Sequence, residues 1–306
     1  MRLSRMLWLW LGLVALLLSG CAGRSSAGAI AFESRQGDSS DILLLSLADQ
    51  KLTTLVSDPA WDGTPAISPD GKRLAFASDR DGDPEIFVMN MDGSGLVKLT
   101  DNTAADYMPA WSPDGTRIAF VSDRTYFVPL EGGNLEVSSG LELYVMDADG
   151  RNVVRLTGDQ NDVSLYPSWS PDGQKIAYMN VSNVAHIYVV DVNPENPQPR
   201  DLTPELTISA WSPRWSPDGK YIIFMGDDQT KKGIYRMDAD GGNLVELTRD
   251  WPAYAVDPAW SPDGRRIVFA SNPGGAVNLY TMTPDGKDIQ QLTKGSGYYA
   301  LPSWSR

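Results

Sequence analysis

The stretch Pro109-Ala110-Trp111-Ser112-Pro113-Asp114-Gly115 recurs along the chain with small changes. Its copies begin at Pro65, Pro109, Pro167, Pro213 and Pro258, and a shorter copy begins at Pro302. The steps between successive copies are 44, 58, 46, 45 and 44 residues. A period of about 40 to 45 residues with strand-like contents is typical of propeller blades, each built from four strands.

Each repeat unit contains one clear turn and several short apolar runs. In Ser112-Pro113-Asp114-Gly115 the proline presets φ, the aspartate bonds to nearby backbone, and the glycine takes a left-handed conformation. The runs 117–122, 142–146 and 153–157 are too short for helices and are bounded by turn residues, so they predict strands. Their two apolar faces favour sheets that stack face to face.

The two ends of the chain complement each other. Residues 28–34, 41–45 and 51–56 align with the second, third and fourth strands of a unit, but no tryptophan phrase precedes them. Docking 302–306 beside Ile30 would complete this blade and leave no exposed edge. We therefore predict an all-β fold, a six-bladed β-propeller of four-stranded antiparallel blades over residues 28–306, with its first blade formed by 28–56 and 302–306.

These repeats resemble the PD40 repeats, a WD40-like family known from TolB-like propellers of the bacterial periplasm. The resemblance covers residues 28–306 and rests on the Trp-Ser-Pro-Asp-Gly phrase, on Ala-Phe-x-Ser-Asp-Arg at 75–80 and 119–124, and on Tyr-x-Met-Asp-Ala-Asp-Gly at 144–150 and 235–241. It implies the propeller fold. TolB carries an additional α/β domain in front of its propeller that contacts an inner-membrane partner, and we expect the present chain to lack that domain.

Residues 1–20 read as a secretion signal that is removed. The stretch Leu18-Ser19-Gly20-Cys21 resembles the lipobox of bacterial lipoproteins, in which the cysteine is acylated. The alternative is ordinary cleavage, which would leave Cys21 idle. Because Cys21 is the only cysteine, it has no disulfide partner. We expect 21–27 to be a lipidated cysteine with a short tether. The residue after the cysteine is Ala22 and not the aspartate that usually means retention in the inner membrane of Gram-negative bacteria. We therefore expect the protein in the outer membrane, facing the periplasm or the cell surface.

The composition restricts the partners and the chemistry. The net charge is −13 for the whole chain, and removal of the two signal arginines makes it −15. A protein with this net negative charge is not expected to bind nucleic acid or anionic lipid through its surface. We therefore expect contact with the membrane through the lipid anchor only. The chain contains neither a Gly-x-Ser-x-Gly elbow nor a phosphate-binding glycine loop. We therefore expect no catalytic residues. Separately, we expect the protein to be a monomer.

Metal ligands are scarce. The single histidine, His186, stands at the start of a third strand, where a solvent-edge residue such as Glu85 or Glu142 is expected. One histidine and one cysteine do not provide the usual zinc clusters. Calcium has one weak candidate site, formed by three alternating carboxylates, Asp79, Asp81 and Asp83. A plain hairpin loop explains the same stretch better, and we expect no cofactor.

The loops between one unit and the next combine amphipathic aromatic residues with carboxylates, a mixture typical of binding surfaces. Together with two aromatics of the loop 125–140, they predict a binding face, composed of Trp61, Asp62, Asp106, Tyr107, Tyr126, Phe127, Tyr166, Trp211, Trp251, Tyr254, Asp257, Tyr298 and Tyr299. The alternative is that these side chains form a lid over the blade cores. The repeat tryptophans are better explained as core than as ligand platforms, and they are Trp111, Trp169, Trp215, Trp260 and Trp304.

The third unit is longer than its neighbours, with its extra residues in 125–140. This loop carries an apolar cluster that begins at Tyr126 and Phe127. It predicts a contact arm or a flap over the central channel, unless it is an insertion without a role.

The leading functional hypothesis is a lipid-anchored, non-catalytic scaffold that binds another cell-envelope protein. The alternative is a glycan-binding or glycan-processing propeller, hydrolase or lyase, in which Asp62 and Asp106 act as acid and base at the channel mouth.

Overall fold

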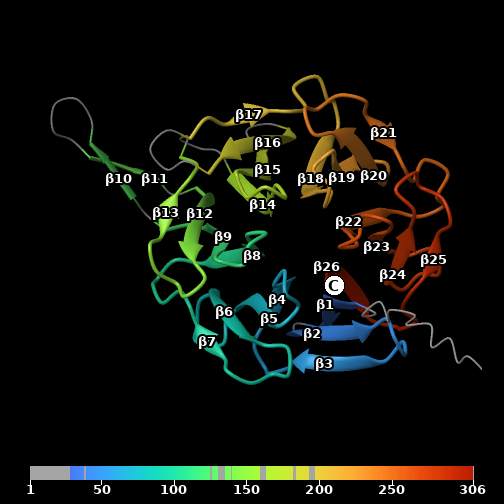
Figure 1. The fold of residues 1–306 in the computed structure, drawn as a ribbon, viewed down its shortest axis with the longest axis horizontal. Coiled ribbons are helices and arrows are strands. Elements are labelled where there is room, and N and C mark those ends of the chain that lie inside the picture. The colour runs from blue at the N-terminus through green and yellow to red at the C-terminus, as the bar shows by residue number, and fades with distance from the viewer. Residues whose placement is uncertain are drawn as a thin grey trace, which may run out of the picture.

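The computed structural model describes residues 28–37, 39–124, 126–129, 135–138, 140–158, 163–181, 184–192 and 197–305, and for 126–129 and 135–138 it describes the backbone only. The predicted signal and Cys21 lie outside these residues. Six four-stranded antiparallel sheets form a closed ring (Figure 1). The predicted six-bladed propeller is confirmed. The described residues contain no helix that could cross a membrane.

Each blade runs from an innermost strand near the axis to an outermost strand at the rim. In this order the first contains β26 (Tyr298–Trp304), β1 (Ala29–Gln36), β2 (Ser39–Ser46) and β3 (Leu52–Val56). The second contains β4 (Asp62–Ile67), β5 (Arg73–Ser78), β6 (Glu85–Asn90) and β7 (Val97–Lys98). The third contains β8 (Asp106–Trp111), β9 (Arg117–Ser122), β12 (Glu142–Asp147) and β13 (Val154–Arg155).

The remaining three blades follow the same order. The fourth contains β14 (Val163–Trp169), β15 (Lys175–Val181), β16 (Ala185–Asp191) and β17 (Arg200–Asp201). The fifth contains β18 (Ser209–Trp215), β19 (Tyr221–Asp227), β20 (Lys232–Asp238) and β21 (Val245–Glu246). The sixth contains β22 (Ala255–Trp260), β23 (Ile267–Ser271), β24 (Asn278–Met282) and β25 (Gln290–Gln291).

The C-terminal strand closes the ring as predicted. β26 pairs antiparallel with β1, with Ile30 opposite Trp304. The backbone nitrogen of Ser305 donates to the carbonyl of Ala29 at 2.8 Å. The strand is longer than the predicted 302–306, because pairing continues to Arg35 opposite Tyr298. Strand β1 therefore lies between β26 and β2 and has no free edge.

In five blades the outermost strand contains only two residues and is shorter than the sequence indicated, whereas β3 of the first blade contains five. The predicted run 153–157 contributes only Val154 and Arg155 to β13. Leu156 still donates to the carbonyl of Leu143 at 2.8 Å, but the nitrogen of Leu143 then donates to the Thr157 hydroxyl at 2.9 Å. The threonine side chain replaces the backbone as partner, so strand pairing ends there.

The Ser-Pro-Asp-Gly phrase forms the predicted turn. The nitrogen of Gly115 donates to the carbonyl of Ser112 at 2.9 Å, and Gly115 has a φ of 69°. The Ser112 hydroxyl donates to Asp114 Oδ1 at 2.6 Å, and the nitrogen of Thr116 donates to the same oxygen at 3.0 Å. These hydrogen bonds to the charged form lower the pKa of Asp114 to about 2, with Ser112 as the largest cause.

This turn makes the stability of the protein pH-dependent. The pKa of Asp114 falls from 3.8 to about 2 on folding, so its contribution is present above about pH 4 and is lost as the pH falls through about 2. Asp114→Asn keeps an acceptor oxygen but removes the charge. We expect it to lower the midpoint of thermal unfolding at pH 6, by an amount that shrinks towards pH 2. The exposed Asp250→Asn serves as the control, and an Asp114→Asn effect that is equal at both pH values would contradict this account.

The core lies between neighbouring blades. The second strand of every blade carries one fully buried aromatic ring, namely Phe32, Phe76, Phe120, Tyr178, Phe224 and Phe269. Three repeat tryptophans are buried beside this core and donate from Nε1 to the inner strand of the preceding blade, Trp111 to Ala66 at 3.0 Å, Trp169 to Ala110 at 3.0 Å and Trp260 to Arg214 at 3.2 Å. Their predicted core role is confirmed. Trp215 and Trp304 are only half-buried.

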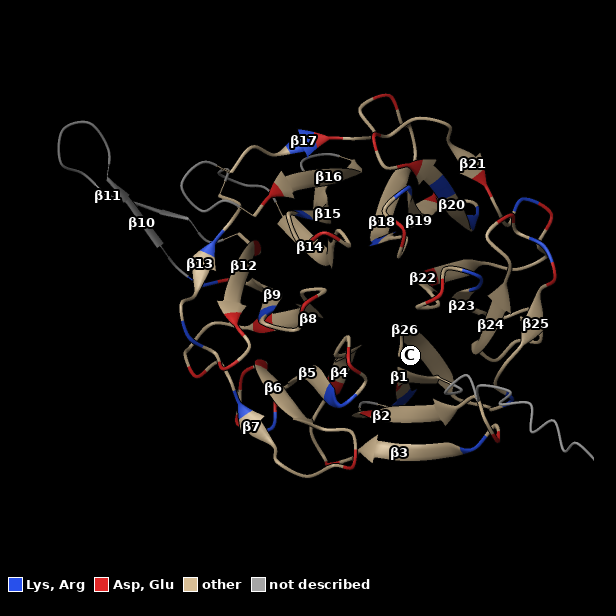
Figure 2. Ribbon diagram, viewed as in Figure 1, with Lys and Arg blue, Asp and Glu red and all other residues tan. Residues whose placement is uncertain are grey.

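The long loop of the third unit contains a hairpin. β10 (Tyr126–Pro129) pairs with β11 (Leu135–Ser138), with Tyr126 opposite Ser138, and the two form a sheet of their own. Figure 1 shows this hairpin extending outward from the rim of the third blade. The prediction of a flap over the channel is therefore wrong, while a contact arm stays a prediction. Figure 2 shows acidic and basic residues distributed along the described chain over all six blades.

Candidate functional site

The innermost strands share a bulge halfway along their length. In each blade the pairing register shifts at the residue pair that ends in proline. The residue before that proline has a left-handed backbone, with φ between 50° and 58°, at Thr64, Met108, Tyr166, Ser212, Asp257 and Leu301. A residue before proline is normally extended, and a non-glycine residue with positive φ is uncommon. The propeller thus imposes one strained backbone on six different side chains that surround the axis.

A central cavity opens beside this ring. Its volume is about 850 Å³, and it is bordered by four of the bulge residues, by all five repeat tryptophans and by turn residues such as Pro69 and Pro113. The cavity therefore lies at the end of the channel where the Ser-Pro-Asp-Gly turns are found. Most of the predicted binding face lies at the opposite ends of the same inner strands, whereas Tyr166 and Asp257 lie in the bulge ring itself.

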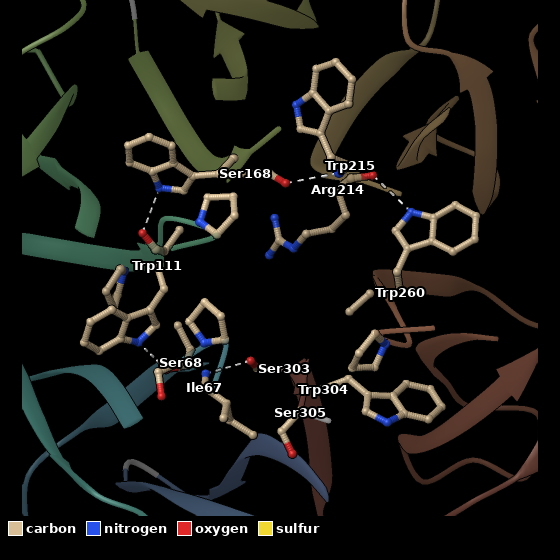
Figure 3. Close-up of a pocket in the computed structure, with 18 of the residues that line it drawn as sticks. Ile67, Ser68, Trp111, Ser168, Arg214, Trp215, Trp260, Ser303, Trp304 and Ser305 are labelled. Atoms are coloured by element: carbon tan, nitrogen blue, oxygen red, sulfur yellow. Dashed lines mark hydrogen bonds between the residues drawn. The ribbon is translucent and has the colours of Figure 1, made fainter. Parts of the chain in front are cut away.

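One positively charged residue, Arg214, interrupts the repeat pattern inside this cavity. The position between the proline and the tryptophan is occupied by small residues in five blades, Ala66, Ala110, Ser168, Ala259 and Ser303, and by Arg214 in the fifth blade. Protein atoms surround Arg214, yet its side chain keeps some exposed surface in the cavity. Figure 3 shows it projecting into the open centre. We did not select Arg214 from the sequence, although comparing the repeat copies position by position would have found it.

The bulge residues near Arg214 are polar. Burial raises the pKa of Tyr166 to about 12, with the negative charge of Asp257 as the next cause. Burial also raises the pKa of Asp257, although a hydrogen bond from the backbone of Leu301 and the charge of Arg214 oppose the shift. Burial lowers the pKa of Arg214, and Asp257 opposes that shift. One sector of the channel is therefore polar, while Met108 and Leu301 contribute apolar side chains elsewhere in the ring.

The aromatics of the predicted binding face mostly pack over the blades. Trp251 donates from Nε1 to the hydroxyl of Ser271 at 2.8 Å. Tyr299 packs edge-on against Phe32, with ring centroids 5.1 Å apart. Other aromatics of this face also pack on core clusters, namely Trp61, Tyr107, Trp211 and Tyr254. Among the described aromatic side chains of this face, Tyr298 is the most exposed, at 39%. Tyr166 and Asp257 lie in the bulge ring, and the side chains of Tyr126 and Phe127 lie outside the described part of the molecule.

The two carboxylates considered as an acid and base pair are fully buried. Asp62 accepts a hydrogen bond from Arg80 at 2.7 Å, and Asp106 accepts two from Arg124 at 2.8 and 3.0 Å. Asn102 Nδ2 donates to Asp106 at 2.9 Å. These contacts hold the loops to the blades and leave neither carboxylate facing solvent.

The third-strand carboxylates are also buried, so the expectation of a solvent-edge position there was wrong. Glu85 and Glu142 are 0% and 1% exposed. Burial raises the pKa of Glu85, an effect increased by nearby Asp106. At the equivalent place in the fourth blade, His186 Nδ1 lies 2.7 Å from Asp201 Oδ2. Glu85 and Glu142 are thus enclosed by the blade, whereas His186 stays partly exposed beside Asp201.

The weak calcium candidate does not form a cluster. Asp79 accepts a hydrogen bond from the nitrogen of Trp61 at 2.7 Å, and Asp81 forms an ion pair with Lys98 at 3.5 Å. Across the described ranges, no three histidine, cysteine, aspartate or glutamate side chains are grouped to hold a metal ion.

Comparison with known proteins agrees with this architecture. The family model PD40, described as the TolB beta propeller domain, matches residues 23–136 and 126–306. The crystal structure of TolB from Acinetobacter baumannii is 23% identical, with a TM-score of 0.75 over 92% of this chain and 67% of that one. A TolB-type structure from Agrobacterium tumefaciens is 22% identical, with a TM-score of 0.68 over 88% of this chain and 90% of the other.

The fold also occurs in an enzyme. Hydrazine synthase from Kuenenia stuttgartiensis is 16% identical, with a TM-score of 0.75 over 91% of this chain and 46% of that one. At such identities the likeness concerns the fold alone. The family match extends over most of the sequence and agrees with the six observed blades. The chain therefore belongs to the PD40 family of TolB beta-propeller domains.

Proposed function

We propose that this protein is a non-catalytic, lipid-anchored scaffold of the bacterial cell envelope that binds another protein in its central cavity. The observation that carries the proposal is the cavity of about 850 Å³, whose walls combine tryptophan and proline with an arginine, Arg214, that projects into its open centre. Membership of the TolB propeller family and the predicted signal with Cys21 support an envelope location.

The geometry of the first blade supports an orientation for this scaffold. The start of β1 lies beside Ser305, at the end of the blade where the Ser-Pro-Asp-Gly turns are found. A tether of residues 22–27 spans about 20 Å when extended. An acylated Cys21 would therefore hold the cavity mouth towards the membrane and turn the predicted aromatic face away from it. A partner at the cavity would itself be close to that membrane.

Affinity capture tests the proposal and separates the two faces. The full chain, tagged after residue 306, is recovered from detergent-solubilised envelope beside two variants. Met108→Glu places a charge in the cavity wall, and Tyr298→Ala changes the most exposed aromatic of the opposite face. We expect the parent and Tyr298→Ala to retain one partner protein and Met108→Glu to lose it, with all three melting at similar temperatures.

Other results would contradict parts of the proposal. Loss of the partner only in Tyr298→Ala would move the site to the predicted aromatic face. No retained protein in any sample would contradict protein binding and leave the glycan hypothesis to be screened with cell-wall oligosaccharides. A Cys21→Ser variant that stays in the membrane fraction would contradict the lipid anchor.

A further inference from the structure

The side chain of Arg214 is not required by the repeated structure of the propeller. Its main chain takes part in the contact between neighbouring blades, because its carbonyl accepts the hydrogen bond from Trp260. Its side chain stands at a position where the other five blades have alanine or serine. The blades therefore close without an arginine here, and a buried cation is costly unless something balances it.

The partners of the Arg214 guanidinium are incomplete. Its Nη1 donates to the carbonyl of Pro213 at 2.9 Å. Asp257 acts on it through the field of its charge, without an ion pair at contact distance among the described residues. Arg73, on the same cavity wall, provides the contrast. Its Nη2 donates to the carbonyl of Gly115 at 3.2 Å, and its guanidinium lies 4.4 Å from the centre of the Trp111 ring.

One further donor acts on Arg214, namely the hydroxyl group of Tyr166, which also lines the cavity. The Tyr166 hydroxyl keeps its proton at neutral pH, because its pKa is about 12. A guanidinium with one hydrogen bond, beside a protonated hydroxyl in a cavity, matches an anion.

We propose that Arg214 is the anchor of an anion site that binds one carboxylate, carried by an acidic side chain of an extended peptide segment entering the cavity from the turn face. The planar guanidinium matches a carboxylate through two parallel hydrogen bonds. Asp257 behind it reduces the positive potential, which favours a singly charged carboxylate over a doubly charged phosphate. The peptide source rests on the proposed protein-binding function, whereas the carboxylate chemistry rests on the cavity alone.

The tryptophans supply a position-specific measurement. The indole N–H signals of Trp111, Trp169, Trp215, Trp260 and Trp304 report on the cavity, and those of Trp61, Trp211 and Trp251 report on the opposite end of the channel. N-acetyl-aspartate N-methylamide is the probe, and the asparagine analogue is its neutral control. We expect the aspartate probe to shift the cavity signals in a saturable way. The asparagine analogue should have no such effect.

Three substitutions test the assignment, each after its thermal midpoint has been compared with the parent. Arg214→Gln should weaken binding of the aspartate probe by about tenfold or more, because a charge-assisted hydrogen-bonded pair is lost. Arg73→Gln should leave binding unchanged, because the Arg73 guanidinium already donates to the carbonyl of Gly115 and packs on the Trp111 ring. Asp257→Asn should strengthen binding, because it removes an opposing negative charge.

Several outcomes would overturn the proposal. Equal shifts with the asparagine analogue, or equal losses in Arg73→Gln and Arg214→Gln, would show that Arg214 does not anchor a carboxylate. Tighter binding of galacturonate than of the aspartate probe, lost in Arg214→Gln, would overturn the peptide source in favour of a sugar acid. A captured partner with no response to the aspartate probe would overturn the anion site but not the scaffold. A probe response without any captured partner would overturn only the scaffold.

Discussion

Deletion of residues 298–306 is expected to abolish the cooperative unfolding transition of the ring. The deletion removes β26, which pairs with β1 and packs on β22, β23 and β4. The edge of β1 would then be unpaired and free to associate with another chain. We expect a broad unfolding transition in urea and association detected by size-exclusion chromatography. Adding a synthetic peptide of residues 298–306 should restore much of the cooperativity.

A single substitution on β26, at Trp304, tests how much one side chain contributes to closing the ring. Trp304 packs against the cluster that includes Ile30, Phe32 and Val268. Trp304→Ala should lower the free energy of unfolding by about 2–4 kcal/mol, at the lower end for a tryptophan because the side chain is only half-buried. Trp111→Ala, inside the ring, is the control and should lose about 3–5 kcal/mol, because Trp111 is buried, without exposing a strand edge that promotes association. An unchanged urea midpoint in both the deletion and Trp304→Ala would refute closure of the ring by β26.

Arg124→Met is expected to be among the most destabilising single substitutions at neutral pH. Arg124 pairs with the fully buried Asp106 through both carboxylate oxygens, and its guanidinium lies 4.9 Å from the centre of the Tyr144 ring. Removing it leaves Asp106 beside a second buried carboxylate, Glu85, with Asn102 bonded to Asp106. Breaking one side of a buried ion pair costs about 3–5 kcal/mol.

The comparison with an exposed pair gives this prediction its control. Arg151 lies 3.6 Å from Asp149, and its side chain is 81% exposed. Arg151→Met should change the free energy of unfolding by less than about 1 kcal/mol, because solvent screens such pairs. Both variants are compared with the parent by urea denaturation at pH 7. A small loss in Arg124→Met, together with loss of the partner in the capture experiment, would instead support the surface role predicted for Asp106.

The fold could be predicted because its signals are local and repeated. Turn chemistry in Ser-Pro-Asp-Gly, the short apolar runs and the tryptophan missing at one chain end were enough to predict six blades and their closure. The left-handed bulge could not be predicted in this way. A residue before proline favours extended backbone, and only pairing on both sides of Thr64 or Leu301 overrides that preference.

The site was harder to predict for a different reason. Carboxylates and aromatics in loops look alike whether they face solvent or fold back onto a blade. Asp62 and Asp106 fold back because an arginine 18 residues later reaches each of them, a spacing that was visible but that we interpreted only as part of the family motif. The end of the channel at which the cavity opens depends on how the six inner strands are arranged in space. That arrangement could not be inferred from a single sequence.

The position of β1 between β26 and β2 also affects how the molecule would bear mechanical load. A pull on residue 28 along the strand acts parallel to β1, so the hydrogen bonds to both neighbours share the force in shear instead of opening one after another. Resistance to such a pull is set by the unfolding barrier rather than by equilibrium stability. If Cys21 is the attachment point, the blade made from both chain ends is the element that transmits tension from the membrane to the whole ring.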